Sequence, residues 1–290
     1  METIHTVAWM KQVAREARRN ERILGLVPTM GALHEGHLSL VREAQGQCAP
    51  VVVSIFVNPT QFGPAEDFQK YPRTLEADRA ALQKMGVDYI FAPPPEEVYQ
   101  EGFRTFVDVE GLNARLEGRT RPGHFRGVAT VVLKLFEIVQ PRFAFFGRKD
   151  AQQVRIIRQM AADLNLDAQV VVCPIVREAD GLALSSRNAY LNGDERRAAT
   201  ALYRSLDAVQ REIAAGERDV ARLVAAMRRV IDAESKVSLD YAEIVDADTF
   251  EPALAVRKSC YALIATRVGS TRLIDNALID ADGEAVRVTV

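Results

Sequence analysis

The chain is poor in the features that mark secreted, membrane-spanning and disulfide-bonded proteins. Its 290 residues include only three cysteines, Cys48, Cys173 and Cys260, which stand far apart and form no CxxC pair. That count argues against a disulfide framework or a zinc site and suits a reducing compartment. No apolar run approaches the roughly 20 residues that a membrane span requires, and the N-terminal segment is too polar for a signal peptide. We therefore expect a cytoplasmic protein.

The sequence also lacks an excess of charge of either sign. Lys and Arg total 37, Asp and Glu total 39, and the formal net charge is -2. A protein that grips nucleic acid through its phosphates usually has a basic excess, so we expect no nucleic-acid partner and no membrane partner. Hydrophobic residues make up 48% of the chain and charged residues 26%, which is ordinary for a globular protein.

Short apolar runs alternate with amphipathic segments through the first part of the chain. Strands that are apolar throughout and separated by helices indicate a parallel sheet covered on both faces. We expect residues 1–176 to form an α/β domain with a Rossmann-like, doubly wound parallel sheet, whose ligands lie beyond the carboxyl ends of the strands. The expected strands are near 23–27, 51–56, 88–91, 142–146 and 168–172, and the expected helices near 7–20, from Gly36, 74–85, 127–139 and 150–164.

The pattern changes after residue 176. We expect a smaller C-terminal α+β domain over residues 177–290, with Asp194 opening its first helix, Gly216 closing that helix and Asp219 capping the second. Asp282-Gly283 predicts a hairpin turn before the last strand. The expected helices are near 193–215 and 219–234, and the expected strands near 239–245, 260–268, 272–279 and 285–290.

The segment after the first expected strand carries the strongest functional signal. It reads Met30-Gly31-Ala32-Leu33-His34-Glu35-Gly36-His37. Its two glycines let the backbone approach a ligand, and the following helix directs its free N–H groups at the same space. His34 and His37 lie on one face of that helix start and suit a phosphate whose charge grows during reaction. A tight turn with surface histidines is the less favoured alternative. The segment is not a P-loop, because His37 stands where a P-loop has its lysine and Leu38 where it has its hydroxyl residue.

Further polar segments follow other strands, and none of them decides the function alone. The amides of Asn58 and Gln61 suit hydroxyls and a carboxylate. Lys149 can neutralise a phosphate, Asp150 can cap the next helix, and Gln153 lies one turn along it. A proline turn with solvated amides, and a helix cap with a solvated charge pair, are the alternatives.

Two basic segments complete the set. Residues 119–127 are rich in arginine, include His124 and have the composition of a flexible segment. We expect them to form either a cover for an anionic ligand or an exposed loop. Leu184 to Arg187 lie at the expected domain junction, where two hydroxyls and an arginine suit either phosphate binding or a polar hinge.

Five of these segments, in this order and spacing, resemble the pantothenate synthetase (pantoate–β-alanine ligase) family along essentially the whole chain. The first also marks the wider HxGH nucleotidyl-transfer superfamily. Leu184 stands where many members have methionine, and Arg148 where an acidic residue is common. The segments are Pro28 to His37, Asn58 to Phe62, Arg121 to Gly127, Gly147 to Gln153, and Leu184 to Asn188.

The resemblance implies an ATP-dependent ligase that joins pantoate to β-alanine through a pantoyl adenylate. It implies ATP and Mg²⁺ as cofactors and a cytoplasmic homodimer. His37, His34 and Lys149 would be catalytic, and Gln61 and Gln153 would hold pantoate. No metal ligand is assigned, although Asp78 is a candidate. The other implied nucleotide contacts are Met30, Gly31, Ala32, Leu33, Glu35, Gly36, Gly147, Arg148, Asp150, Val176, Leu184, Ser185, Ser186 and Arg187.

Other activities remain open at this point. A nucleotidyltransferase would use the same two histidines on a phosphate-bearing acceptor, although the amides of Gln61 and Gln153 argue against such an acceptor. A tRNA-charging enzyme is disfavoured by the short chain and the acidic second domain. A nucleotide-binding module without turnover is the alternative from another functional class.

Overall fold

The chain folds into two compact units. The computed structural model describes residues 1–64, 66–282 and 285–290. The first unit comprises residues 1–148 and 152–174, and the second comprises residues 149–151 and 175–290. Three residues that follow a strand of the first unit, Lys149–Ala151, therefore belong by their contacts to the second.

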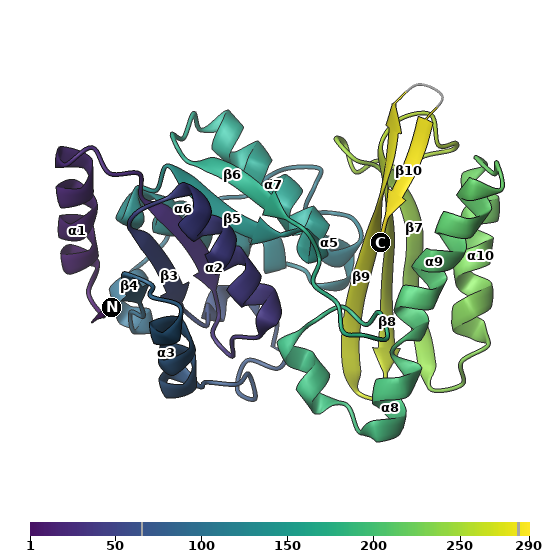
Figure 1. Ribbon diagram of the computed structural model, residues 1–290, viewed down its shortest axis with the longest axis horizontal. Helices are drawn as coiled ribbons and strands as arrows, with labels where there is room; N and C mark the ends of the chain where they lie inside the picture. Colours follow the sequence, from purple (N-terminus) through teal and green to yellow (C-terminus); the bar gives the residue numbers. More distant parts are fainter. Residues whose placement is uncertain (65, 283–284) are drawn as a thin grey trace. The chain divides into compact units, whose positions relative to one another are not determined.

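A six-stranded sheet forms the centre of the first unit, with the order β1-β4-β3-β2-β5-β6 and every pair parallel (Figure 1). The chain winds outward from β2 in both directions, so the switch point of the topology lies between β2 and β5. The doubly wound sheet expected from the sequence is confirmed. Its strands are β1 (Glu2–Ile4), β2 (Gly25–Thr29), β3 (Val51–Ile55), β4 (Tyr89–Phe91), β5 (Phe143–Gly147) and β6 (Gln169–Cys173).

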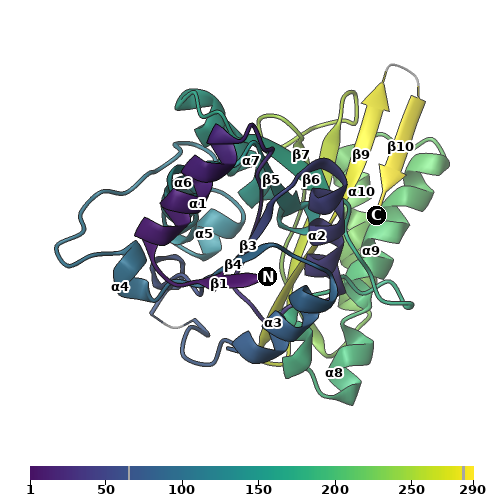
Figure 2. The ribbon, with the colours of Figure 1, turned by 60° about the vertical axis from the view of Figure 1, so that its left-hand side comes forward.

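Helices cover both faces of this sheet. The helices α1 (Val7–Arg19), α6 (His124–Val139) and α7 (Ala151–Asp163) share one hydrophobic core with the sheet. The helices α2 (Glu35–Gln47) and α3 (Leu75–Lys84) contribute to a second core on the opposite face. Figure 2 shows α1 and α6 on one side of the strands and α2 and α3 on the other. Burial on both faces explains why the strands are apolar throughout.

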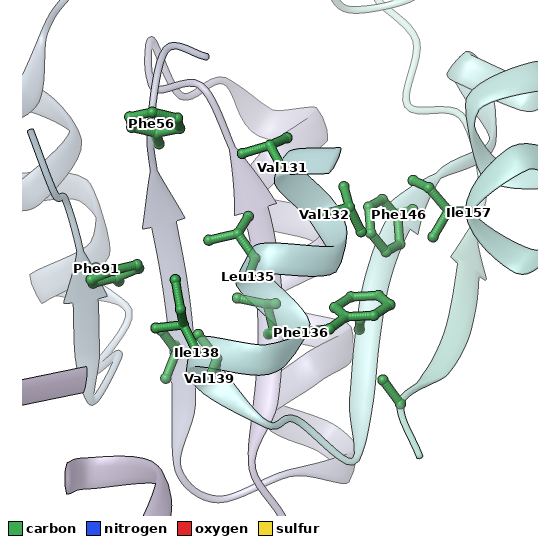
Figure 3. Close-up of a cluster of buried hydrophobic side chains, with 14 of the residues drawn as sticks. Phe56, Phe91, Val131, Val132, Leu135, Phe136, Ile138, Val139, Phe146 and Ile157 are labelled. Carbon is green, nitrogen blue, oxygen red and sulfur yellow. The ribbon is translucent and has the colours of Figure 1, made fainter. Parts of the chain in front are cut away.

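The helix α6 supplies much of the first core. Its apolar residues recur at three- and four-residue spacing and lie against phenylalanines of the neighbouring strands and loops (Figure 3). Each large side chain removed from water in this way contributes about 1.5–3 kcal/mol. The packed residues labelled there include Val131, Val132, Leu135, Phe136, Ile138, Val139, Phe56, Phe91 and Phe146.

Strand β2 runs two residues further than the sequence predicts. Pro28 and Thr29 continue the pairing with β3, where Pro28 lies opposite Ser54. The pairing of β2 with β5 reaches only Leu26, so the N–H that Pro28 lacks is not needed on that side. The functional turn consequently starts at Met30, directly after the strand.

Residues 119–127 do not form the flexible loop that the sequence suggested. A helical turn, α5 (Glu117–Thr120), is followed by α6, which begins at His124. Gly123 makes the corner with a φ of +82°. Like α5, two further short elements were not predicted, because neither is long enough to show a period: strand β1 and helix α4 (Pro95–Val98).

The second unit is an antiparallel sheet with helices packed on it. The sheet has the order β10-β9-β8-β7, and α9 and α10 pack against it and against each other to enclose the core of this unit. The expected α+β organisation is confirmed. The elements are α8 (Gly193–Ala198), α9 (Ala201–Ala214), α10 (Val220–Asp232), β7 (Val237–Asp246), β8 (Cys260–Val268), β9 (Thr271–Asp282) and β10 (Ala285–Thr289).

The helix expected at 193–215 is two helices, α8 and α9. The hydroxyl of Thr200 donates to the carbonyl oxygen of Arg197 at 2.8 Å, a side-chain bond that competes with the regular helix ladder. Asn192, not Asp194, caps α8, whereas Asp219 caps α10 as expected. The predicted turn at Asp282-Gly283 includes Gly283, which lies outside the described residues. Within the described ranges, no helix is long and apolar enough to cross a bilayer.

We expect Gly127→Ala to destabilise the protein by about 1–3 kcal/mol, as overpacking usually does. A Cβ on Gly127 would lie 2.3 Å from the carbonyl oxygen of Thr60 and 2.7 Å from the Cα of Gln61. Urea denaturation measures the loss. Gly46→Ala is the matched control, because a Cβ on this exposed helical glycine meets nothing within 4 Å and should stabilise by about 0.5–1 kcal/mol. Equal stability of the two variants would contradict this packing.

Candidate functional site

The turn between β2 and α2 stands at the switch point of the first sheet. Gly31 and Ala32 have positive φ angles of +81° and +50°, which turn the chain sharply from the strand into the helix. His34 is the N-cap residue of α2, and His37 is the third residue of that helix. The parallel sheet thus directs this turn beyond its carboxyl edge, where ligands of such sheets bind.

The two histidines form a reciprocal cap. The backbone N–H of Gly36 donates to Nδ1 of His34 at 3.2 Å, and the backbone N–H of His34 donates to Nδ1 of His37 at 3.3 Å. The ring centroids are 4.1 Å apart. Because each Nδ1 accepts a backbone hydrogen bond, each neutral ring carries its hydrogen on Nε2. The pair therefore presents two Nε2–H donors near a helix N-terminus, which is a suitable arrangement for phosphate oxygens.

Glu35 and Asp78, both near this turn, have structural contacts. Glu35 forms an ion pair with Arg42 along α2. The carboxylate of Asp78 accepts backbone hydrogen bonds from Ala32 and Leu33 at 3.0 and 2.8 Å. Asp78, a candidate metal ligand from the sequence, holds the turn through these two bonds.

The amides after β3 are buried and bonded to each other. Asn58 is 1% exposed, and its Nδ2 donates to Oε1 of Gln61 at 3.0 Å and to the carbonyl oxygen of Gly127 at 3.1 Å. Nε2 of Gln61 contacts the sulfur of Met30 at 3.2 Å. Asn58 therefore orients the Gln61 amide, and Gln61 lies against the turn that follows β2.

His124 supports the backbone of Gln61. Its Nδ1 donates to the carbonyl oxygen of Gln61 at 2.8 Å, and its Nε2 accepts from Nη1 of Arg121 at 3.0 Å. A carbonyl only accepts and a guanidinium only donates, so the contacts fix a neutral ring with its hydrogen on Nδ1. Arg121 is itself paired with Glu66. Burial, and next the Arg121 charge, lower the pKa of His124 to about 4.

Two adjacent glutamines of α7 have different surroundings. Gln152 is buried and uses its whole amide within the protein: it accepts from the N–H of Glu117 and donates to the carbonyl oxygens of Leu112 and Arg115. Gln153 points about 100° around the helix from it and is only half-buried. Gln153 is therefore the more accessible of the two amides.

The lysine segment continues from β5. Gly147 ends the strand, and Arg148 to Asp150 form the short 3-10 helix η2. In the second unit, Nδ2 of Asn276 donates to the carbonyl oxygen of Lys149 at 2.9 Å. Asn276 is 1% exposed and lies on β9, so a rigid strand holds the backbone of Lys149.

Val176 and Leu184 lie side by side in the second unit. The N–H of Leu184 donates to the carbonyl oxygen of Val176 at 3.0 Å, and Gly181 turns the chain between them with a φ of +91°. Ser185 then caps the short 3-10 helix η3 (Ser186–Tyr190) by accepting from the N–H of Arg187 at 3.2 Å. These bonds order the segment that the sequence assigned to phosphates.

A buried ion pair anchors the same segment. Arg177 contacts both carboxylate oxygens of Asp275, at 2.7 and 3.0 Å, and its guanidinium lies over the ring of Tyr203. Asp275 and Asn276 are neighbours on β9, and each holds one of the expected nucleotide segments. The sequence analysis missed both; the available signal was two adjacent polar residues between the apolar pairs Leu273-Ile274 and Ala277-Leu278.

The family follows from comparison with known proteins. The model of the family described as pantoate-beta-alanine ligase matches residues 2–278. The chain belongs to the pantoate-beta-alanine ligase family. Pantothenate synthetase of Acidobacterium capsulatum is 55% identical over 290 residues, covering 96% of this chain and 97% of that protein. Pantothenate synthetase of Roseiflexus sp. (strain RS-1) is 56% identical over 281 residues, covering 97% of this chain and 100% of that protein.

Solved structures of pantoate-beta-alanine ligases agree. The pantothenate synthetase from Thermus thermophilus has a TM-score of 0.91 and 47% identity, covering 95% of this chain and 98% of that one. The ligase from Francisella tularensis, described as complexed with beta-gamma ATP and beta-alanine, has a TM-score of 0.79 and 33% identity, covering 95% of this chain and 97% of that one.

The buried imidazole of His124 makes folding depend on pH. Its folded-state pKa of about 4 lies below the ordinary value near 6.5, so the unfolded chain binds the extra proton first as pH falls. Stability from this group is complete above about pH 6.5 and falls between about 6.5 and 4 by roughly 3 kcal/mol. We expect the unfolding free energy of wild type to decline relative to that of His124→Asn over this range. Parallel curves for both proteins would contradict the assignment.

Proposed function

We propose that the protein is an ATP-dependent ligase that condenses pantoate with β-alanine. In the first step a pantoate carboxylate oxygen attacks the α-phosphorus of ATP, the bond to pyrophosphate breaks, and pantoyl adenylate remains. In the second step the amine of β-alanine attacks the acyl carbon and AMP leaves. Membership of the ligase family supports this reaction, and the observation in the chain itself that carries it is the capped histidine pair at the switch point.

The histidine pair suits the first step. Negative charge grows on the phosphates as pyrophosphate leaves, and the Nε2–H groups of His34 and His37 would stabilise it. A well-placed donor of this kind is worth about 3–4 kcal/mol, or 10²–10³ in rate. His37 is proposed as the principal catalytic group, and Met30 to His37 as a nucleotide-binding turn.

The amides suit pantoate. Gln61 and Gln153 can orient hydroxyl groups and a carboxylate without adding positive charge, which would make the carboxylate a poorer nucleophile. The bond from Asn58 fixes the direction of the Gln61 amide before substrate arrives, which lowers the ordering cost of binding. We propose that Gln61 also lies near β-alanine.

Other groups are proposed for the nucleotide. Lys149 carries the charge that a phosphate requires, and its backbone is held by Asn276. Residues 147–150, Val176 and residues 184–187 are proposed as further nucleotide contacts. Mg²⁺ would accompany the phosphates of ATP and neutralise part of their charge. A homodimer in the cytoplasm is the proposed assembly and location.

An omission assay tests the reaction. Purified protein should release AMP only when ATP, Mg²⁺, pantoate and β-alanine are all present, and pyrophosphate should appear with pantoate but without β-alanine in a single turnover. His37→Ala should lower that single-turnover pyrophosphate release by about 10² or more. His5→Ala is the matched control, because His5 is exposed and lies outside the turn.

Two results would contradict the proposal. Transfer of the nucleotidyl group to a phosphate-bearing acceptor would identify a nucleotidyltransferase. Calorimetric binding of ATP with no AMP from this pair of substrates would identify a binding module.

The role of His37 is tested separately. Near-normal pyrophosphate release by a folded His37→Ala variant would remove His37 from the mechanism.

Gln153→Ala should raise KM for pantoate by up to about tenfold, because one substrate hydrogen bond contributes about 0.5–1.5 kcal/mol. The KM for ATP should change less. Gln159→Ala is the control on the same helix, since the amide of Gln159 donates to Asp163 on the exposed face. Steady-state kinetics measures both, and equal effects of the two substitutions would refute the assignment of Gln153.

A further inference from the structure

The backbone N–H groups of the turn after β2 are directed into the protein. The N–H of Gly31 donates to Oγ1 of Thr29 at 3.1 Å, and that hydroxyl donates in turn to the carbonyl oxygen of Ser54 at 2.7 Å. The next two N–H groups, of Ala32 and Leu33, donate to Oδ2 and Oδ1 of Asp78. A phosphate-binding loop of the P-loop kind points such groups at its ligand, so this turn works differently.

Asp78 is a buried carboxylate with a full set of donors. It is 3% exposed and lies in the first turn of α3, where a helix N-terminus favours negative charge. The hydroxyl of Thr74 adds a third hydrogen bond, to Oδ2, at 3.2 Å. Burial of an ionised carboxylate is costly unless such partners are supplied, and here two of the three come from the turn.

The turn is also shaped to fit this carboxylate. A Cβ on Gly31 would lie 3.0 Å from Oδ2 of Asp78 and 3.1 Å from a methyl group of Ile55. The positive φ of Gly31 and of Ala32 brings the two following amides round to the same two oxygens. The helix α3 and the turn are 46 residues apart at the bond to Ala32, so the contact is tertiary.

We propose that Asp78 is a positioning residue for the nucleotide turn and not a metal ligand. The inference rests on the proposed function, because it assumes that His34 and His37 meet the phosphates. By holding the amides of Ala32 and Leu33, Asp78 fixes the chain immediately before His34. The phosphates are then left to the Nε2–H groups of the two rings, whose Nδ1 atoms are occupied by the cap.

Kinetics of Asp78→Asn test the proposal. The asparagine oxygen can accept from one of the two amides, but its NH₂ group opposes the other, so the turn should loosen. We expect KM for ATP to rise at least tenfold and kcat to fall, while KM for β-alanine changes less than twofold. Glu76→Gln is the matched control: it removes a charge from the same helical turn, but Glu76 is exposed and its kinetics should equal those of wild type.

The outcomes separate the possible roles. A fall in kcat with every KM unchanged would reflect only a smaller folded fraction, and unchanged kinetics would mean that the turn does not need Asp78; either result overturns the proposal. Restoration of Asp78→Asn activity by a raised Mg²⁺ concentration would overturn it in favour of a metal ligand.

Hydrogen exchange on the wild-type protein gives a second measurement that needs no folded variant. Ala32 and Leu33 are only half-buried, so slow exchange of their amides would report the bonds to Asp78, and exchange at the rate of a free loop would overturn the proposal. If wild type formed no pantothenate but both amides were protected, the proposed function would fail while the anchoring by Asp78 stood.

Discussion

The pairing of β2 with β3 on one side and β5 on the other is the constraint on which the site of the first unit depends. Because all three strands are parallel, their following segments emerge at one edge of the sheet. The turn with the histidines follows β2, the buried amides follow β3, and the lysine segment follows β5 along the chain. Burial of both sheet faces holds this register, since a slip by one residue would exchange the two faces.

At that edge, internal hydrogen bonds fix many of the polar groups in place. Five N–H groups of the histidine turn donate to Thr29, Asp78 and the two rings, so these backbone donors are used within the protein. Gln152 and Gln153 differ in the same respect. The amide of Gln152 is buried and hydrogen-bonded to two carbonyl oxygens and one N–H of the protein, whereas Gln153 is only half-buried.

The sequence predicted most of the regular elements and the closeness of His34 and His37, because both depend on local signals. Apolar runs located the strands of the first unit, and the spacing of His34 and His37 correctly placed them together. The partners were not predictable in the same way: Asp78, Asp275 and Asn276 act on residues 46, 98 and 127 positions away. The hydrophobic periodicity of the sequence carries no information about such long-range contacts. His124 was misjudged in another way, since a basic segment expected to be a flexible cover or an exposed loop contains a buried ring.

The close approach of α6 to the segment after β3 makes several positions depend on one another. Gln61 is held through its side chain by Asn58 and through its backbone by His124, and Gly127 leaves no room between that backbone and the helix. Residues that share partners in this way do not combine additively. Substitutions at Asn58, Gln61, His124 and Gly127 should therefore show epistasis, and a library that varies all four together would contain folded combinations that no series of single substitutions reaches.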